Sequence, residues 1–289
     1  MTLKQALERA RGALLARGID DVPLECQLLL RQASGISQVQ LYLDLDRELS
    51  SEEEAGFWCL VQRRLSGEPI AYIRGHREFY GLDFSVEPGV LIPRPESELL
   101  VEQAIKLAKN RAVSAVAEIG TGCGAVAINL ALHLPQAKIY ATDISASALR
   151  VAQSNCQKHG VADRVCLLRG DMLHPLPEPV DIIIANLPYV REAELSQVNS
   201  AGFEPLLALN GGVDGLDKIR QLCGQAGDRL CPQGSLLLEI GQGQATAVTA
   251  LLSRLFPSAE VEVMPDLSGI ERVVRATLTA VREPSLAAF

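Results

Sequence analysis

The spacing of apolar residues divides the chain into a helical first part and a second part in which strands and helices alternate. Over residues 3–66, apolar positions recur every three or four residues, as at Leu3, Leu7 and Ala10, which predicts amphipathic helices. We therefore predict a small helical domain over residues 1–69. We expect this domain to recognise a binding partner, and a purely structural cap is the alternative.

The pattern changes to short, strand-like pieces over residues 70–94. The segments IAYIRG (70–75) and FYGLDFSV (79–86) are rich in β-branched and aromatic residues, and Gly75 and Gly81 punctuate them. We predict a β-hairpin that links the helical domain to the rest of the chain.

Residues 95–289 alternate between short apolar runs and helical patterns, which predicts an α/β fold whose mostly parallel sheet is covered on both faces. The last two strands lie too close together for a crossover helix, so we expect an antiparallel hairpin at the sheet edge. The predicted strands cover residues 116–119, 138–142, 165–169, 181–185, 235–240, 260–264 and 272–278, and the helices include 125–133 and 146–159.

The segment VDIIIANLPY, residues 180–189, combines a buried strand with an abrupt end. Its branched apolar run is typical of a strand in a parallel sheet, and Pro188 cannot donate to a sheet ladder. Asn186 and Tyr189 should therefore lie at the carboxyl end of the sheet, where open α/β folds bind ligands. An amide and a ring beside a fixed turn suit a flat, nitrogen-bearing group. A strand followed by an ordinary turn is the alternative.

A glycine-rich loop joins the first strand of this sheet to a helix. Its residues are Gly120, Thr121, Gly122, Cys123 and Gly124. Alternate glycines let the backbone turn tightly and approach a ligand. Asp143 ends the next strand, about where an acid binds ribose hydroxyls in dinucleotide folds. Together these features indicate an adenosine-type ligand, and a tight turn beside a surface acid is the alternative.

S-adenosylmethionine fits this pattern better than NAD. The glycine spacing is GxGxG rather than GxGxxG, and Glu118 precedes the loop, where it would repel a pyrophosphate. Asp171 could accept a hydrogen bond from the adenine amine, and Met172 could pack on the ring. Met172 as an ordinary core residue is the alternative.

The composition narrows the function classes. Nothing in the chain of 289 residues reaches about 18 consecutive apolar positions, so we expect no membrane span, and the first residues lack an apolar signal core. The seven cysteines form no CxxC pair and the four histidines do not cluster, so we expect no disulfide, no metal and a cytoplasmic location. The net charge of −8 argues against a broad nucleic-acid-binding surface.

Several further motifs join the glycine loop, Asp143 and the Asn-Leu-Pro-Tyr turn. Together they resemble the HemK/PrmC family, the N5-glutamine methyltransferases of peptide chain release factors. The glycine loop and the turn also occur in many other methyltransferases, whereas LIPRPE and the FEPLLAL and GGVDGL pair are far more specific to this family. The matching segments are PIAYIRG (69–75), FYG (79–81), VLIPRPE (90–96), FEPL (203–206), GGVDGL (211–216) and DLSGIER (266–272).

The resemblance implies a Rossmann-like, class I S-adenosylmethionine-dependent methyltransferase that acts on the glutamine of a release factor's Gly-Gly-Gln loop. It also implies a helical N-terminal domain that helps to bind the release factor, no direct nucleic-acid substrate, and here we expect a monomer. The implied cofactor contacts are Gly120 to Gly124, Asp143, Met172 and Asn186, to which the residue chemistry adds Asp171. The implied catalytic and substrate-binding residues are Asn186, Leu187, Pro188 and Tyr189.

Two positions depart from the family pattern. The turn of the family is most often Asn-Pro-Pro-Tyr, and Leu187 replaces the first proline. We expect activity to persist, because the backbone carbonyl remains and Pro188 still favours an extended Leu187. Met172 occupies a position that is often aromatic, so we expect weaker adenine stacking.

Three other functions remain open at this stage. An RNA or DNA adenine methyltransferase would present the same planar amine to the turn, but it should carry a basic groove. A ribosomal-protein glutamine methyltransferase would share the turn and differ in its N-terminal domain. A catalytically silent, cofactor-binding protein is the third, and an intact Asn186 and Tyr189 disfavour it.

Overall fold

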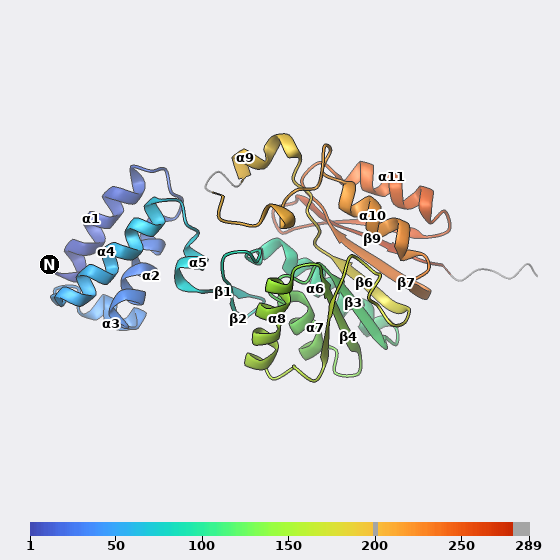
Figure 1. Cartoon of the computed structure of the whole chain (residues 1–289), viewed down its shortest axis with the longest axis horizontal. Coiled ribbons are helices and arrows are strands. Elements are labelled where there is room, and N and C mark those ends of the chain that lie inside the picture. The colour runs from blue at the N-terminus through green and yellow to red at the C-terminus, as the bar shows by residue number, and fades with distance from the viewer. Residues whose placement is uncertain (199–201, 280–289) are drawn as a thin grey trace, which may run out of the picture. The chain divides into compact units, whose positions relative to one another are not determined.

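The computed structural model describes residues 1–198 and 202–279, and it divides into two compact units, Met1–Arg77 and Glu78–Phe289 (Figure 1). The division falls inside the segment that we predicted as a linker. The predicted catalytic domain, residues 95–289, also includes 199–201 and 280–289, which lie outside the described residues. In the described part of the chain, no helix has both the length and the apolar character that crossing a membrane requires.

The first unit is helical, as predicted. Capping boxes begin three of its helices, because Thr2, Ser37 and Ser50 each accept from the third backbone N–H of the following helix. Its core contains the fully buried side chains of Leu29 and Phe57. The helices are α1 (Leu3–Leu15), α2 (Val22–Ser34), α3 (Gln38–Leu43), α4 (Ser51–Leu65) and α5 (Ile70–Arg74).

The strand predicted over residues 70–75 is wrong, because α5 occupies this segment. Pro69 begins the helix and its carbonyl accepts from the N–H groups of Tyr72 and Ile73. Gly75 ends it with φ 77°, a left-handed conformation that glycine adopts without a steric penalty. A proline before the segment and a glycine after it are helix boundary signals, and they outweigh the β-branched and aromatic residues between them.

A hairpin is present immediately after this helix, but its strands are not the two predicted segments, because its turn falls inside the segment 79–86. Strands β1 (His76–Phe79) and β2 (Leu82–Ser85) pair in a two-stranded sheet. Tyr80 and Gly81 connect them with φ of 50° and 75°. Positive φ at both central residues is the requirement of the tight turns that join antiparallel strands.

The second unit is built on one sheet, in which the described residues form seven strands in the order β5-β4-β3-β6-β7-β9-β8. The strands β5, β4, β3, β6 and β7 are parallel, and β9 and β8 form the antiparallel edge. This confirms the predicted α/β class and its edge hairpin. The bounds are β3 (Ala115–Ile119), β4 (Lys138–Asp143), β5 (Val165–Arg169), β6 (Val180–Ala185), β7 (Leu230–Glu239), β8 (Glu260–Pro265) and β9 (Glu271–Thr277).

Helices cover both faces of this sheet (Figure 1). On one face, α10 and α11 pack through a buried cluster that includes Ile183, Leu222 and Val248. The alternate strand residues, such as Val116 and Ile184, are also fully buried, and α6 and α7 contact the sheet there. The helices are α6 (Glu98–Asn110), α7 (Ala125–His133), α8 (Ala146–Lys158), α9 (Leu195–Val198), α10 (Asp217–Ala226) and α11 (Ala245–Leu255), with 3₁₀ turns η1 (Pro95–Ser97), η2 (Glu192–Glu194) and η3 (Leu206–Ala208).

The strand order creates a switch point between β3 and β6. From β3 the chain proceeds outward through β4 to β5, and it then returns to place β6 on the other side of β3. The connections that leave the carboxyl ends of two such strands diverge, which opens a crevice between them. The glycine loop leaves β3 and the Asn-Leu-Pro-Tyr turn leaves β6, so the fold brings the two predicted motifs to this crevice.

Candidate active site

The glycine loop is held by the end of β4. Gly120 and Thr121 both donate their backbone N–H to the carbonyl of Thr142, each at 2.9 Å. Gly120, Gly122 and Gly124 have φ of 74°, 57° and 85°, which explains the alternating glycines. A Cβ on Gly124 would lie 3.2 Å from the Cβ of Ala152, so this glycine allows α7 to pack closely on α8.

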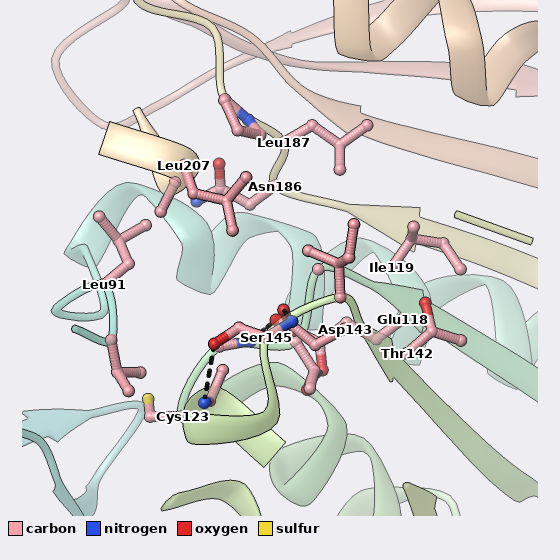
Figure 2. Close-up of a pocket in the computed structure, with 18 of the residues that line it drawn as sticks. Leu91, Glu118, Ile119, Cys123, Thr142, Asp143, Ser145, Asn186, Leu187 and Leu207 are labelled. Carbon is pink, nitrogen blue, oxygen red and sulfur yellow. Dashed lines mark hydrogen bonds between the residues drawn. The ribbon is translucent and has the colours of Figure 1, made fainter. Parts of the chain in front are cut away.

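A hollow of about 1140 Å³, including its open mouth, lies beside the loop (Figure 2). Across this hollow, Asn186 and Leu187 face Cys123 and Ser145. The structure therefore brings nearly all predicted cofactor contacts to one place, while Gly124 lies in the packing contact described above. The predicted residues that line the hollow are Gly120, Thr121, Gly122, Cys123, Asp143, Asp171, Met172, Asn186, Leu187 and Pro188.

Glu118 lines the hollow, and its side chain is almost completely buried. Its Oε2 accepts from the Thr121 hydroxyl at 2.5 Å and from the Ala127 backbone N–H at 2.9 Å. Burial raises the pKa of Glu118 to about 8, and the two hydrogen bonds oppose this shift. Near neutral pH the carboxyl group is therefore largely protonated, and a neighbouring cation would favour its ionised form.

Asp143 ends β4 and links the loop to the start of α8. Its Oδ2 accepts from the Gly122 N–H at 2.9 Å, and its Oδ1 accepts from the Ser145 N–H at 2.8 Å (Figure 2). Burial raises the pKa of this carboxyl group, while the backbone hydrogen bonds favour its ionised form. A carboxylate has about four acceptor positions, so Asp143 retains the capacity to bind ligand hydroxyls.

Asp171 and Met172 follow β5 at the edge of the same hollow. Asp171 Oδ2 accepts from Gln221 Nε2 at 2.6 Å. Met172 has φ 49°, and its carbonyl accepts from the Thr142 hydroxyl at 3.1 Å. The Met172 side chain is buried in the sheet cluster and also lines the hollow, so both interpretations of this residue describe part of its environment.

The Asn-Leu-Pro-Tyr turn stands between this hollow and a second one. The second hollow, about 940 Å³ with its open mouth, is lined by residues that include Arg94, Tyr189, Arg191 and Gln244. Asn186 and Leu187 line both hollows. A group bound in the second hollow could therefore meet a ligand in the first across these two residues.

A buried carboxyl group on the neighbouring strand holds the polar side chains of the turn. Asn186 Nδ2 donates to the Ser97 hydroxyl oxygen at 2.9 Å, and this hydroxyl donates to Glu239 Oε2 at 2.5 Å. The Tyr189 hydroxyl donates to Glu239 Oε1 over a longer separation of 3.4 Å. Burial raises the pKa of Tyr189 well above its usual value and that of Glu239 to about 7.

The segment GGVDGL packs directly under the turn. A Cβ on Gly211 would lie 2.7 Å from the Pro188 carbonyl oxygen, and a Cβ on Gly215 would come still closer to the Tyr189 carbonyl oxygen. The Gly211 N–H also donates to the Val190 carbonyl at 2.9 Å. These glycines allow a backbone-to-backbone contact that any larger residue would prevent.

The motifs LIPRPE and FEPL also meet in the structure. Arg94 Nη2 donates to Glu204 Oε2 at 2.5 Å, and the Ile92 N–H donates to Glu204 Oε1 at 3.3 Å. Glu204 is largely buried, so this ion pair fixes the segment beside Leu91, which lines both hollows. Every family-specific motif of the second unit named here thus builds the surroundings of the turn.

Comparison with known proteins gives matches over nearly the whole chain. A family model described as the PrmC N-terminal domain matches residues 5–75, and one described as the methyltransferase small domain matches residues 95–202. The release factor glutamine methyltransferase of Moorella thermoacetica is 43% identical over 274 residues, which cover 94% of this chain and 97% of that protein. The chain belongs to the HemK/PrmC family of release factor glutamine methyltransferases. The predicted resemblance is confirmed.

Other relatives agree with this membership of the HemK/PrmC family. The release factor glutamine methyltransferase of Geobacter sulfurreducens is 40% identical over 276 residues, which cover 94% of this chain and 95% of that protein. Among solved structures, a 16S rRNA methyltransferase of T. thermophilus in complex with AdoMet and guanosine is 19% identical, with a TM-score of 0.51. The match covers 70% of this chain and 49% of the T. thermophilus chain, and this likeness confirms the methyltransferase fold.

Sequence reasoning did not find Ser97 and Glu239, although both hold polar side chains of the turn in this HemK/PrmC site and Ser97 lines the first hollow. The sequence could have indicated Glu239. An acid at the end of the apolar run 235–240 must lie beside the carboxyl end of β6 if the two strands are parallel neighbours. Ser97 had no such signal, since a serine before a helix reads as an ordinary cap.

Proposed function

We propose that this chain methylates the side-chain amide nitrogen, N5, of the glutamine in the Gly-Gly-Gln loop of class I peptide chain release factors, with S-adenosylmethionine as the methyl donor. The observation that carries the proposal is the position of Asn186 and Leu187, which line both hollows. Relatives named as release factor glutamine methyltransferases, at about 40% identity over most of the chain, supply the substrate class.

The chemistry of the first hollow fits this cofactor. Asp143 keeps acceptor positions for ribose hydroxyls, and Asp171 offers a carboxylate to the adenine amine. Met172 presents a polarisable side chain to the ring. Glu118 would ionise beside the cationic amino acid portion, which offsets the cost of its burial. In this assignment Gly120 to Cys123 let the backbone approach the ligand, and Gly124 acts through packing.

The turn would make a poor nucleophile reactive by positioning it. A glutamine amide nitrogen is weakly nucleophilic because its lone pair is delocalised into the carbonyl. The Asn186 side-chain oxygen and the Leu187 carbonyl would accept its two N–H groups, while Pro188 fixes the turn and Tyr189 packs on the amide plane. S-adenosylmethionine supplies a methyl group activated by a sulfonium. With the reacting atoms held about 3–3.5 Å apart, positioning supplies most of the rate enhancement.

The proton balance of the reaction needs no dedicated base. A bond would form between the amide nitrogen and the methyl carbon while the bond from that carbon to sulfur breaks. The nitrogen then carries an extra proton and is acidic enough to release it to water. This leaves positioning as the task of the protein side chains.

The decisive experiment follows labelled methyl transfer from S-adenosylmethionine to a purified bacterial release factor. A release factor whose Gly-Gly-Gln glutamine is replaced by alanine is the matched control. We expect label on the natural factor alone. No label on either factor, with cofactor binding verified, would overturn the proposal and direct the search to ribosomal protein and RNA substrates.

Asn186→Ala supplies the first prediction for the site. We expect turnover to be lost while cofactor affinity changes little, because the variant removes an acceptor for the substrate and leaves the glycine loop intact. Single-turnover kinetics and calorimetric titration of the cofactor measure the two effects separately. Substantial turnover by this variant would contradict the assigned role.

The partner and location follow from the same proposal. We propose that the helical domain predicted over residues 1–69 helps to bind the release factor, that the protein acts as a monomer, and that it works in the cytoplasm, where translation ends. The binding partner and the location rest on the function of the relatives and on the predicted domain division.

A further inference from the structure

Glu239 connects the two side chains that would hold the substrate amide. Its carboxyl group is only 1% exposed and lies at the carboxyl end of β7, beside β6. One oxygen accepts from the Ser97 hydroxyl at 2.5 Å and the other accepts from the Tyr189 hydroxyl at 3.4 Å. Ser97, itself 5% exposed, accepts from Asn186 Nδ2 at 2.9 Å. A single carboxyl group thus holds Tyr189 directly and Asn186 through one hydroxyl.

The direction of these hydrogen bonds determines which end of the Asn186 amide faces Ser97. A hydroxyl has one proton, and Ser97 gives its proton to Glu239. Its lone pairs can then only accept, so they select the NH₂ end of Asn186. The side-chain oxygen of Asn186 is left for another donor. If the amide turned over, its NH₂ would meet the NH₂ of a glutamine substrate, and two donors would face each other.

We propose that Glu239 is a positioning residue for methyl transfer, because through Ser97 it orients the Asn186 amide with its oxygen toward the substrate and at the same time holds Tyr189. This inference rests on the proposed function. It assigns to Glu239 and Ser97 a task in the reaction rather than in folding alone. The task depends on an ionised Glu239, which can accept from both hydroxyls.

The charges around Glu239 allow it to titrate in a useful range. Burial is the largest influence on the pKa of Glu239 and raises it to about 7. The hydrogen bonds from Ser97 and Tyr189 lower this pKa, Glu96 raises it and Arg272 lowers it. Arg272 itself contacts Asp266 at 3.0 Å and Glu96 at 3.9 Å, and Arg94 and Arg272 both lie near Tyr189. A protonated Glu239 could donate to Ser97, and the Ser97 hydroxyl would then turn its proton toward Asn186. We therefore expect kcat to rise with pH through about 7 and to level off above it.

Glu239→Gln tests the orientation without changing the shape of the side chain. The new amide can accept from Tyr189 and donate to Ser97, which reverses the direction of the chain and turns the Asn186 amide over. We expect kcat for the release factor to fall about 10- to 100-fold, the effect of leaving one or two buried hydrogen bonds unmade. Cofactor affinity should stay within about twofold, and the rise of kcat near pH 7 should disappear.

Ser97→Ala should reduce kcat to a similar extent, because Asn186 then loses the acceptor that selects its NH₂ end. Ser235→Ala is the matched control, since Ser235 is a fully buried serine of β7, four positions before Glu239, whose hydroxyl lies 3.0 Å from that of Thr277. We expect this control to lower the melting temperature without changing kcat or its pH profile.

A reversal of the whole chain of hydrogen bonds provides the sharpest test. In Asn186→Asp, carboxylates on both sides of Ser97 compete for its one proton. With Glu239→Gln added, the introduced amide donates to the Ser97 hydroxyl, and this hydroxyl donates to one oxygen of the carboxylate introduced at position 186. The other oxygen of that carboxylate, which faces the substrate, is then free to accept. We expect the double variant to turn over at least about 10-fold faster than the Asn186→Asp variant, a recovery of the same size as the single-variant loss.

The outcomes separate this inference from the function on which it rests. If the natural protein does not label the release factor, both are overturned. If it labels the factor but Ser97→Ala and Glu239→Gln both keep kcat within twofold, or the double variant is no faster than Asn186→Asp, only the role of Glu239 is overturned. Loss in both single variants together with recovery in the double variant establishes it.

Discussion

Two buried carboxyl groups lie near the carboxyl ends of strands in the site, and burial raises the pKa of both. Glu118 lies at the end of β3 beside the first hollow, and Glu239 lies at the end of β7 beside the turn. Burial raises their pKa values to about 8 and about 7. Desolvation of this size makes a side chain sensitive to a nearby cation, since the cation favours the charged form.

Glu118 should therefore couple cofactor affinity to pH. Without ligand the carboxyl group is largely protonated below about pH 8. A cationic ligand favours the ionised form and lowers the pKa, so binding below pH 8 releases a proton. We expect the dissociation constant for S-adenosylmethionine to decrease as pH rises from about 6.5 to 8. Calorimetric titration in buffers of different ionisation enthalpy measures both the affinity and the proton release.

Glu118→Gln is the control for this coupling. The glutamine can still accept from Thr121 and Ala127, whose donors lie at 2.5 and 2.9 Å from the carboxylate in the natural protein. Its affinity should be weaker and should follow only the titration of the cofactor's own amino group. An unchanged proton release in the variant would show that another group is responsible.

Leu187, the departure from the usual turn, has a structural task that a proline could not fulfil in the same way. Its side chain is buried in the sheet cluster, and its Cδ2 would lie 3.5 Å from a Cβ on Gly120. It therefore fills the space between the turn and the glycine loop. Leu187→Ala should lower the free energy of unfolding by about 2–5 kcal/mol, as for other buried leucines. Denaturant titration measures it, and a loss below about 1 kcal/mol would contradict this packing role.

At the level of elements, the contact between GGVDGL and the turn predicts a selective loss. Gly215 has φ 80°, and any Cβ there would overlap the Tyr189 carbonyl oxygen. We expect Gly215→Ala to displace the turn and reduce kcat by at least about 10-fold, since a displacement of about 1 Å can cost 100-fold. Cofactor affinity should change by less than about threefold, because in this proposal the glycine loop and the strand ends on the other side of the first hollow hold the cofactor. Steady-state kinetics with the release factor measures the first effect.

Gly224→Ala is the matched control for the Gly215 variant. Gly224 lies within α10, and a Cβ there would have no neighbour within 4 Å. Alanine in a helix interior stabilises by about 0.5–1 kcal/mol relative to glycine, so this control should be more stable and equally active. Equal kinetics for both variants would show that the contact under the turn does not matter.

The elements of the second unit could be predicted because their signals are local. Apolar runs bounded by glycine and proline give the parallel strands, and the short connection after β8 gives the antiparallel edge. The strand predicted over residues 70–75 was wrong because this local signal is ambiguous there: the apolar residues fit a strand or a short helix equally well. There the flanking Pro69 and Gly75 decide the outcome.

The site could be predicted only where a motif lies within one segment. The glycine loop and the turn are continuous in sequence, and the alternation of strands places both at one edge of the sheet. The partners of Asn186 are not continuous with it, because Ser97 is 89 positions away and Ser97 and Glu239 are 142 positions apart. Contacts of this separation depend on the register of the whole sheet, which a single sequence does not reveal.

At the scale of the whole molecule, each unit has its own buried core. The core of Met1–Arg77 centres on residues such as Leu3, Leu30 and Phe57, and the described part of Glu78–Phe289 contains the separate sheet cluster. The glycine loop and the turn both belong to the second unit. If the first unit serves substrate binding, changes on its surface should alter recognition of the intact release factor and leave methyl transfer itself unchanged.

Helix α3 offers the place to test this division of tasks. Val39 and Leu43 are 67% and 76% exposed, and Tyr42 lies between them with its ring half exposed, so the helix presents an apolar surface to solvent. Such a surface is typical of a contact with another protein. We expect Val39→Ser with Leu43→Ser to raise KM for the intact release factor about 5- to 30-fold, equivalent to about 1–2 kcal/mol of lost binding, with kcat unchanged. Transfer to a short peptide that carries only the Gly-Gly-Gln loop should be unaffected.

Leu15→Ser, at an exposed leucine of α1 in the same unit, is the control and should leave the kinetics with both substrates unchanged. An equal loss on the short peptide would show that the variant damages the catalytic unit, and unchanged kinetics with both substrates would exclude α3 from release factor binding.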